Sequence, residues 1–355
     1  MLRDALLSRF PELAQLPDDA LDHALVVGGA IRDLLLGAEP LDVDLTCDDP
    51  LACAERIGRK VIRLGKEELS AYRVVASGRI YDFAETSDLG RRDFTINSMA
   101  LSLRSGELID LYGGEADLRA GIVRMIAAKN FDDDPLRMLK AVRMAVKLGF
   151  TIDAATAEAI RPRAVAILEV AAERVTTEMV AIFSARQLRT SLRLLQELSL
   201  DVPLLGNVDG TFASDDVGAV GAFALLIADP RRYAERWRWS EALLRDVLAL
   251  QRLIKQLAAG ADARVAVYDA GASVAREAPG ALRALGREDL ASLVDSVVTE
   301  ELFATTALLT GEEIASLAGI APGPEVGRLK RKLLEAQIRG EVRTREEAVR
   351  YLLSS

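Results

Sequence analysis

Histidine and cysteine are nearly absent from this sequence. Its 355 residues include one histidine, His23, and two cysteines, Cys47 and Cys53. A structural zinc site needs about four Cys or His ligands, and a Ser-His-Asp or Cys-His nucleophile needs a histidine. The sequence therefore excludes a Cys/His zinc site and argues against both types of nucleophile. The two cysteines are expected to be reduced thiols of a cytosolic protein.

Long apolar runs, a targeting pattern and an excess of basic residues are also missing. No apolar run approaches the roughly 20 residues that a membrane-spanning helix needs. The beginning, MLRDALLSRFPELAQL, has the pattern of an amphipathic helix with acidic residues. The net charge of −9 argues against a generally basic nucleic-acid coat but leaves room for a local basic groove. We therefore expect a cytoplasmic protein with no membrane partner.

Strand and helix signals divide the chain into a mixed first third and a helical remainder. The length of 355 residues predicts about two or three domains. Short strands, two of them joined by a hairpin at Ser77-Gly78, are expected over residues 25–27, 41–45, 61–64, 72–76 and 79–84. After about residue 130 the strand signal ends, and a helical pattern from Pro135 stops before Gly149. The sequence thus predicts an α+β fold, a small mixed-sheet head followed by an elongated all-α part.

Two aspartates two residues apart, Asp42 and Asp44, lie in one expected strand. Side chains alternate along a strand, so both project from the same face while Val43 points to the core. Neighbouring carboxylates repel each other unless a cation neutralises them, and their hard oxygens suit Mg²⁺. The alternative is an edge strand with two ordinary surface aspartates. Asp82, in another expected strand, is a candidate third carboxylate, and Glu85 competes for that role.

A Gly28-Gly29 turn precedes this strand and follows another. The dinucleotide fingerprint GxGxxG is absent. Backbone N–H groups of a strand–turn–helix can approach a phosphate, and a helix N-terminus favours negative charge. A plain tight turn is the alternative, and Arg32 either assists a phosphate or pairs with Asp33. Together with the aspartates, the turn suggests a triphosphate with Mg²⁺.

The segment RRDFTINSMAL supplies a charged cluster, Arg91, Arg92 and Asp93, that is expected to enter a helix. In the functional interpretation the arginines bind phosphates and Asp93 accepts a hydrogen bond from a ribose hydroxyl. In the structural alternative Asp93 is only the helix N-cap, with Ile96 and Met99 packed inward.

The segment FDDDPLRMLKAVRM places Asp134 and Arg137 one turn apart at a helix start. As an acceptor and a donor they fit the pairing edges of cytosine and adenine, each of which has an amino donor and a ring-nitrogen acceptor. Uracil and guanine present a carbonyl and an N–H in the reverse order, so they fit badly. The alternative is that Asp134 only caps the helix before Pro135 and Arg137 is merely exposed.

These motifs, in this order, resemble the class II CCA-adding tRNA nucleotidyltransferase and bacterial poly(A) polymerase family of the DNA polymerase beta-like superfamily. The resemblance is strong over residues 20–185, weaker to 300, and returns at the end. Its motifs are GGAIRDLLLG with DVDLT, RRDFTINSMAL, DLYGGEADLRAGIVR, DDPLRMLKAVRMAVKLGF, ERVTTEM and the tail LTGEEIASLAGIAPGPEVGRLKRKLLEAQIRGEV.

The resemblance implies a nucleotidyltransferase head at 1–128, a neck with the nucleobase-recognition helix at 129–200, and a tRNA-binding body and tail at 201–355. It implies attack of a tRNA 3′-hydroxyl on the α-phosphate of CTP or ATP, with pyrophosphate release and two-metal catalysis by Mg²⁺. Residues 110–124 would form a hinge. The implied catalytic residues are Asp42, Asp44 (both also metal ligands) and Asp82, and the implied nucleotide-binding residues are Gly28, Gly29, Arg32, Arg91, Arg92, Asp93, Asn97, Asp134 and Arg137.

The motifs specify less clearly which nucleotides are added and which residues contact the RNA. CCA, CC, A and poly(A) addition share these motifs, although residues 65–73, at the place of the loop linked to A addition, favour more than CC addition. A nucleotidyltransferase that does not act on RNA and an inactive RNA-binding protein are the rival classes. The expected RNA-binding residues are Arg328, Lys330, Arg331 and Lys332. Residues 230–240 are a second candidate, and a solvated helix face is the alternative for each.

Overall fold

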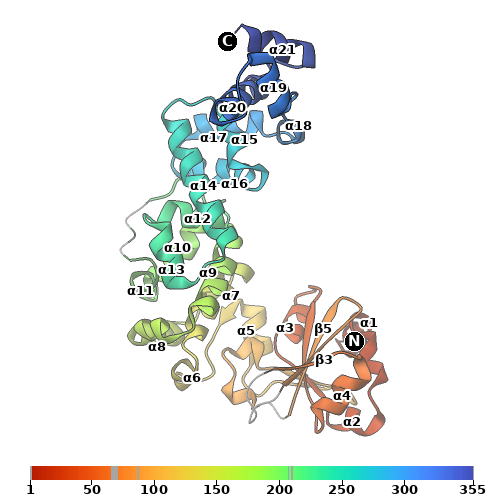
Figure 1. Cartoon of the computed structure of the whole chain (residues 1–355). Coiled ribbons are helices and arrows are strands. Elements are labelled where there is room, and N and C mark those ends of the chain that lie inside the picture. Colours follow the sequence, from red (N-terminus) through yellow and green to blue (C-terminus); the bar gives the residue numbers. More distant parts are fainter. Residues whose placement is uncertain (1, 65–70, 86–87, 207, 209–210, 355) are drawn as a thin grey trace. The chain divides into compact units, whose positions relative to one another are not determined.

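A computed structural model describes residues 2–64, 71–85, 88–206, 208 and 211–354 (Figure 1). Contacts divide the chain into two compact units. The first is Met1–Ala171 with Leu194–Leu204, and the second is Ala172–Arg193 with Leu205–Ser355. This division differs from the expected parts 1–128, 129–200 and 201–355, because the beginning of the expected neck, up to Ala171, belongs to the first unit. The three-part functional division stays a prediction.

A seven-stranded mixed sheet in the order β3-β4-β5-β2-β1-β6-β7 forms the core of the first unit. The strands are β1 (Leu25–Val27), β2 (Asp42–Thr46), β3 (Val61–Leu64), β4 (Ala71–Ala76), β5 (Arg79–Ala84), β6 (Ala100–Ser102) and β7 (Leu108–Ile109). A separate parallel pair is formed by β8 (Ile122–Val123) and β9 (Thr151–Ile152). The α+β prediction is confirmed, and all five expected strands are present to within one residue at each end.

Helices complete the first unit and form all of the second. Up to residue 169 they are α1 (Leu2–Arg9), η1 (Pro11–Gln15), α2 (Asp18–His23), α3 (Gly29–Leu35), α4 (Pro50–Ile57), η2 (Leu89–Arg91), η3 (Thr95–Asn97), α5 (Gly114–Ala120), α6 (Lys129–Asp133), α7 (Leu136–Leu148), α8 (Ala154–Ile160) and η4 (Arg161–Glu169). The next are α9 (Ala172–Ser184), α10 (Leu188–Glu197), α11 (Asp201–Leu205), α12 (Ala219–Leu226), α13 (Pro230–Trp237), α14 (Glu241–Ala258) and α15 (Ala263–Ala270). The last are α16 (Ala272–Ala284), α17 (Glu288–Val297), α18 (Glu300–Ala304), α19 (Gly311–Ala318), α20 (Pro324–Arg339) and α21 (Arg345–Leu353). None of the helices described is both long and apolar enough to cross a membrane.

The strand β2 lies inside the sheet, antiparallel to β1 and parallel to β5. Val43 and Leu45 are buried on the core side, whereas Asp42 is exposed and Asp44 is half-buried on the other face. The alternation is the pattern expected for a strand with one apolar face. The edge-strand alternative for these aspartates is therefore wrong.

A two-residue turn joins β4 to β5. Ser77 and Gly78 both have positive φ, 49° and 75°, which is the backbone of a type I′ hairpin turn. The expected hairpin is confirmed. Its register sets Arg73 opposite Asp82, and β5 in turn sets Asp82 beside Asp44 of β2.

Residues 91–101 do not form the expected helix. They make the short 3-10 turn η3 and then the strand β6. The backbone N–H of Thr95 donates to the carbonyl of Arg124 and that of Ile126 to the carbonyl of Asp93, at 2.9 and 3.2 Å. These distant partners satisfy the groups that a helix would have used, so tertiary pairing overrides the local pattern. Ile96 and Met99 are fully buried, as expected.

The helix α7 follows its sequence pattern closely. Its expected apolar positions, Leu136, Leu139, Val142 and Val146, are at most 3% exposed. It ends at Gly149, whose φ of 70° is left-handed and is easily adopted by glycine.

An aromatic cluster fills part of the second unit. Phe223 lies 5.4 Å from Phe183 and 4.6 Å from Trp239 between ring centroids, and Trp239 lies 5.1 Å from Tyr233. Trp237 adjoins Tyr233 and is 4% exposed. The aromatics of residues 230–240 thus pack against one another and against Phe223, with Tyr233 and Trp239 still partly exposed.

Replacing Gly114 with Ala should destabilise the first unit. An added Cβ would lie 2.9 Å from the carbonyl carbon of Thr95, and this backbone cannot move without breaking its pairing. We expect a loss of about 1–3 kcal/mol in the free energy of unfolding, measured by urea denaturation with far-UV circular dichroism. Gly327→Ala is the control, because that helical position has open space around it and should gain up to about 1 kcal/mol. Equal effects of the two changes would contradict the packing argument.

Candidate active site

Three carboxylates share one face of the sheet. Asp42 and Asp44 lie two residues apart on β2, and Asp82 on β5 is the register partner of Asp44. Burial is the main cause that raises the pKa of Asp44, and Asp82 and Asp42 raise it further, while Arg92 lowers it. The ionised form of Asp44 is therefore costly in the fold, and a cation at this face would relieve that cost.

Arg73 neutralises one of the three carboxylates. Its Nε and Nη2 donate to the two oxygens of Asp82 at 2.8 and 2.7 Å, a bidentate ion pair. Asp82, rather than the exposed Glu85, thus lies beside Asp44. Arg73 was missed from the sequence, although a hairpin around residues 77–78 brings residues 73 and 82 together.

No group of three or more His, Cys, Asp or Glu side chains in the described parts of the chain is arranged to hold a metal ion. This agrees with Asp82 being engaged by Arg73. The oxygens available to a hard cation here are those of Asp42 and Asp44, so further ligands would have to come from a bound molecule or water.

The Gly28 turn lies against Asp44 and Arg92. Gly28 has a φ of 87°, and a Cβ there would lie 2.6 Å from Arg92 Nη1 and 3.0 Å from Asp44 Oδ2. Glycine is required both by the backbone conformation and by the close approach of these side chains. The turn, a strand carboxylate and an arginine therefore meet at one place.

Arg32 is buried and pairs with Asp33. Its Nε and Nη2 donate to Asp33 Oδ1 at 2.8 and 2.6 Å, and its Nη1 donates to Asn97 Oδ1 at 2.5 Å. The pairing alternative for Arg32 is thus the observed one, and the residue links α3 to η3. A role of Arg32 or Asn97 at the nucleotide stays a prediction.

Asp93 is held by its own segment. Its Oδ1 accepts from the Phe94 N–H at 2.8 Å and from Asn97 Nδ2 at 3.0 Å. Its Oδ2 accepts no hydrogen bond from the residues described and remains available. Arg91 is exposed, whereas burial is the main cause that lowers the pKa of Arg92. Asp44 and Asp93 counteract this shift.

The base-recognition candidates lie at the junction of α6 and α7. Asp134 Oδ1 accepts from the Leu136 N–H at 3.3 Å, but the N-cap of α7 is Pro135 rather than Asp134. Arg137 Nη1 donates to the Asn130 carbonyl at 3.0 Å. Arg137 also lowers the pKa of Arg92, so the two guanidinium groups are close enough to repel each other. Asn130 links the two arginines, since it bonds the Arg92 carbonyl through Nδ2 and Arg137 Nη1 through its own carbonyl.

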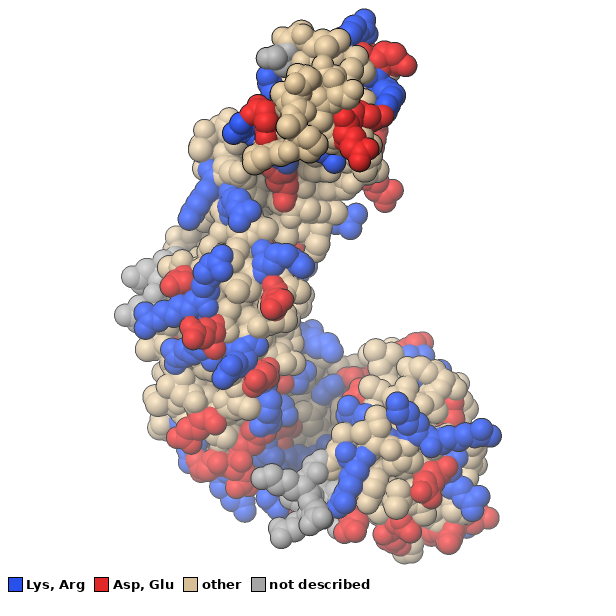
Figure 2. All heavy atoms as spheres, viewed as in Figure 1, with Lys and Arg blue, Asp and Glu red and all other residues tan. Residues whose placement is uncertain are grey.

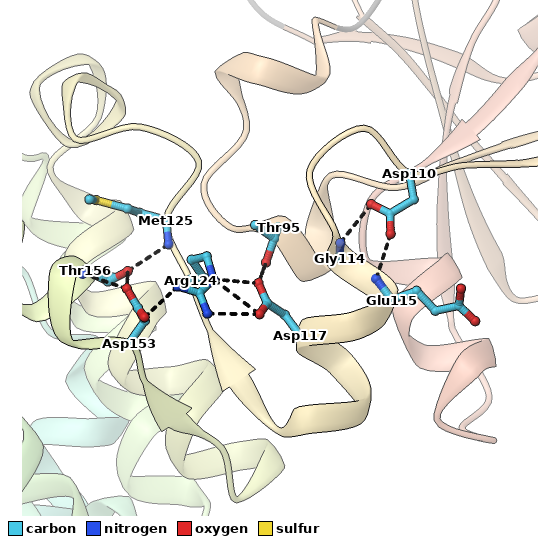
Figure 3. A network of polar contacts seen from close by, with 9 residues as sticks. All are labelled: Thr95, Asp110, Gly114, Glu115, Asp117, Arg124, Met125, Asp153 and Thr156. Atoms are coloured by element: carbon cyan, nitrogen blue, oxygen red, sulfur yellow. Dashed lines mark hydrogen bonds and ion pairs between the residues drawn. The ribbon is translucent and has the colours of Figure 1, made fainter.

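An ion-pair network ties the expected hinge to its neighbours (Figure 3). Arg124 donates to Asp117 at 3.0 Å and to Asp153 at 2.6 Å, and Thr95 Oγ1 donates to Asp117 at 2.7 Å. Asp110 accepts from the first backbone N–H groups of α5. The network links α5, β8 and α8, while motion as a hinge stays a prediction.

The expected RNA-binding residues on α20 are partly neutralised. Arg331 pairs with Asp269 at 2.5 Å and with Glu335 at 2.8 Å, and Arg328 pairs with Glu325. In Figure 2 the basic side chains at the C-terminal end are interspersed with acidic ones. Sequence inspection missed Asp269 because it lies 62 residues from Arg331. Lys330 and Lys332 are exposed and make no ion pair with any residue that the structure describes.

Comparisons with known proteins agree with this geometry. Residues 24–86 and 65–124 match the Poly A polymerase head domain family, and residues 149–207 match the family described as Probable RNA and SrmB- binding site of polymerase A. A CC-adding tRNA nucleotidyltransferase of Geobacter sulfurreducens is 31% identical over 93% of this chain and 91% of that protein. The chain belongs to the class II CCA-adding and poly(A) polymerase family. It is a nucleotidyltransferase by this membership.

Other relatives in the family carry different names. An A-adding tRNA nucleotidyltransferase of Deinococcus radiodurans is 30% identical, with 97% of each chain covered. The fold is like that of the Bacillus stearothermophilus CCA-adding enzyme in complex with CTP, with a TM-score of 0.77, 23% identity, and 99% and 97% of the two chains covered. The Thermotoga maritima CCA-adding enzyme complexed with tRNA has a TM-score of 0.70 at 24% identity, with 99% and 95% covered.

Neutralising Asp44 should stabilise the protein in the absence of divalent cations. Its raised pKa means that the ionised carboxylate costs more in the folded than in the unfolded chain, so Asp44→Asn removes a cost at pH 7. We expect a higher melting temperature for this variant in EDTA, followed by scanning calorimetry. Asp42→Asn is the matched control, because Asp42 is exposed and its neutralisation should change little. A lower melting temperature for Asp44→Asn would contradict the electrostatic account.

Proposed function

We propose that this protein adds C, A or both from CTP and ATP to the 3′ end of tRNA and releases pyrophosphate. The observation that carries the proposal is that Asp44 and Arg92 meet at the Gly28 turn, with Arg137 linked to the Arg92 segment through Asn130. Such a site offers acidic, phosphate-binding and base-binding groups to one nucleotide. The names of the relatives, CC-adding and A-adding tRNA nucleotidyltransferases, support the same reaction.

Mg²⁺ fits the donor set. Asp42 and Asp44 would hold it, since both project from one face of β2 and Asp44 is a half-buried carboxylate whose charge lacks full compensation. When bound, the metal lowers the pKa of an attacking hydroxyl and screens charge on the reacting phosphate. Asp82 would be the third carboxylate of the catalytic group, beside Asp44. Its ion pair with Arg73 holds its carboxylate in place.

The remaining groups bind and orient the nucleotide. Arg91 and Arg92 would supply positive charge for the triphosphate, and Arg92 lies beside Gly28 of the turn. Asp93 Oδ2, which accepts no hydrogen bond from the described residues, would accept from a ribose hydroxyl. These contacts supply positioning and charge stabilisation, which are the main contributions that a protein makes to phosphoryl transfer.

Asp134 and Arg137 would select the base. An acceptor and a donor at these positions pair with the amino group and ring nitrogen of cytosine or adenine, whereas uracil and guanine would leave them facing like groups. Asp134 Oδ1 lies at the start of α7, where it accepts from the Leu136 N–H. Arg137 uses Nη1 for the Asn130 carbonyl, which is one of the five N–H donors of a guanidinium group.

Product lengths would identify which nucleotides are added. Purified protein is incubated with tRNA ending at the discriminator base, at C or at CC, together with each labelled nucleotide. CCA, CC, A and poly(A) addition give different products, and residues 65–70 of the segment expected to influence this choice lie outside the described residues. Incorporation only into acceptors other than RNA, or none at all, would reject the proposal.

Asp44→Asn should abolish incorporation into the tRNA that the wild type extends. Loss of a charged group that acts on the reacting centre costs on the order of 100-fold or more in rate. The readout is labelled nucleotide per enzyme per minute at saturating tRNA. The melting temperature shows that the variant is folded, and near-normal turnover would remove Asp44 from the metal site.

Arg328, Lys330, Arg331 and Lys332 on α20 are proposed to contact the tRNA backbone. Lys330 and Lys332 provide the sharper test, because changing them breaks no ion pair described here. We expect Lys330→Glu with Lys332→Glu to weaken tRNA binding roughly 10-fold at low salt and to flatten its salt dependence, with CTP binding unchanged. Unchanged tRNA affinity would instead favour the exposed arginines of α13.

A further inference from the structure

Asn130, on α6, is a buried residue that joins the two halves of the nucleotide site. It is 1% exposed. Its Nδ2 donates to two backbone carbonyls of the phosphate-binding segment, Gly90 O at 2.9 Å and Arg92 O at 2.7 Å. A side-chain amide has two N–H donors, so both are used. The reverse orientation would set Oδ1 against two carbonyl oxygens, which fixes the amide in the observed orientation.

The main chain of Asn130 holds the base-recognition pair. Its carbonyl accepts from Arg137 Nη1 at 3.0 Å and from the Asp134 N–H at 3.3 Å. The side chain of Asn130 thus binds the segment that carries Arg92. Its backbone carbonyl binds Asp134 and Arg137, the proposed base-recognition pair.

The link through Asn130 consists of uncharged hydrogen bonds. The charged groups around it act on Arg92 in both directions, because Asp44 and Asp93 raise its pKa and Arg137 lowers it. The hydrogen bonds of Asn130 do not depend on this balance of charge, so they hold the spacing whether or not a triphosphate is present.

Keeping an amide at this position has a cost. Asn130 Oδ1 is buried and accepts no hydrogen bond from the residues that the structure describes, and a lone buried acceptor loses the hydrogen bonds that water would give it. A residue that lowers stability at a site is consistent with selection for a role other than folding. Here that role would be to supply the two Nδ2 donors that bind the carbonyls of Gly90 and Arg92.

We propose that Asn130 is a positioning residue for base selection, which fixes Asp134 and Arg137 relative to the phosphate-binding segment. The inference rests on the proposed function. A nucleotide whose phosphates are bound by the Arg92 segment presents its base at a set distance from that segment. The link through Asn130 keeps Asp134 and Arg137 at this distance. Without it, the pair shifts and a wrong base is rejected less well.

The test compares kcat/KM for CTP and UTP on tRNA lacking its 3′ end (for an A-adding protein, ATP and GTP on tRNA ending in CC). Asn130→Ala should lower the ratio of correct to incorrect base by roughly 10-fold or more, since displacement by about 1 Å costs on the order of 100-fold in a positioned reaction. Asn130→Ser, which keeps one donor, should give an intermediate ratio. Equal losses for both nucleotides would overturn the inference.

Thr156→Val is the matched control. Thr156 is also fully buried, and its Oγ1 accepts from the Met125 N–H at 2.9 Å. Its hydrogen bonds to described residues involve neither the Gly90–Arg92 segment nor the base-recognition residues Asp134 and Arg137. Its loss should lower the melting temperature while the selectivity ratio stays unchanged. A fall in the ratio for this variant would show that general loosening, and not Asn130, explains the effect.

A double-mutant cycle tests the positioning role of Asn130 separately from the proposed nucleotide addition. In an Arg137→Ala background the base-reading pair is already lost, so Asn130→Ser should reduce the ratio no further. Additive losses would show that Asn130 does not act through Arg137. A wild-type protein that incorporates no nucleotide would reject the proposed function itself, whereas an active wild type with an unaffected ratio in Asn130→Ser rejects the positioning role alone.

Discussion

The half-buried carboxylate of Asp44 is the constraint around which the site is organised. It lies on a strand with neighbours on both sides, and β5 sets a second carboxylate beside it. Arg73 neutralises that second charge, and Arg92 compensates part of the first. Gly28 leaves room for Arg92 because it has no Cβ. What remains is a partly compensated negative charge beside positive groups, an arrangement that attracts a cation and a polyphosphate together.

The positive side of the site is assembled from segments that do not neighbour one another in sequence. Arg92 belongs to a stretch that pairs with residues 124–126, while Arg137 lies in the first turn of α7. Buried apolar residues such as Ile96 and Phe131 anchor both segments. The hydrogen bonds of Asn130 add polar contacts that join the stretch of Arg92 to the start of α7.

Local pattern was enough to predict β1, β3, β5 and α7, because each has its own periodicity and a glycine turn or cap at its end. It failed at residues 91–101, where Ile96 and Met99 have helical spacing but the backbone pairs with a distant segment. The same limit hid the partner of Arg331, Asp269. Arg73 could have been found, since the hairpin that predicts its neighbour was itself visible. Tertiary partners far along the chain are what a single sequence does not reveal.

The aromatic cluster of the second unit has a spectroscopic consequence. Both tryptophans of the chain, Trp237 and Trp239, lie in or beside it, so the first unit has none. Intrinsic tryptophan fluorescence therefore reports on the helical unit alone, while circular dichroism reports on both. Two unfolding curves recorded on one sample would show directly whether the nucleotide site melts together with the rest of the chain or before it.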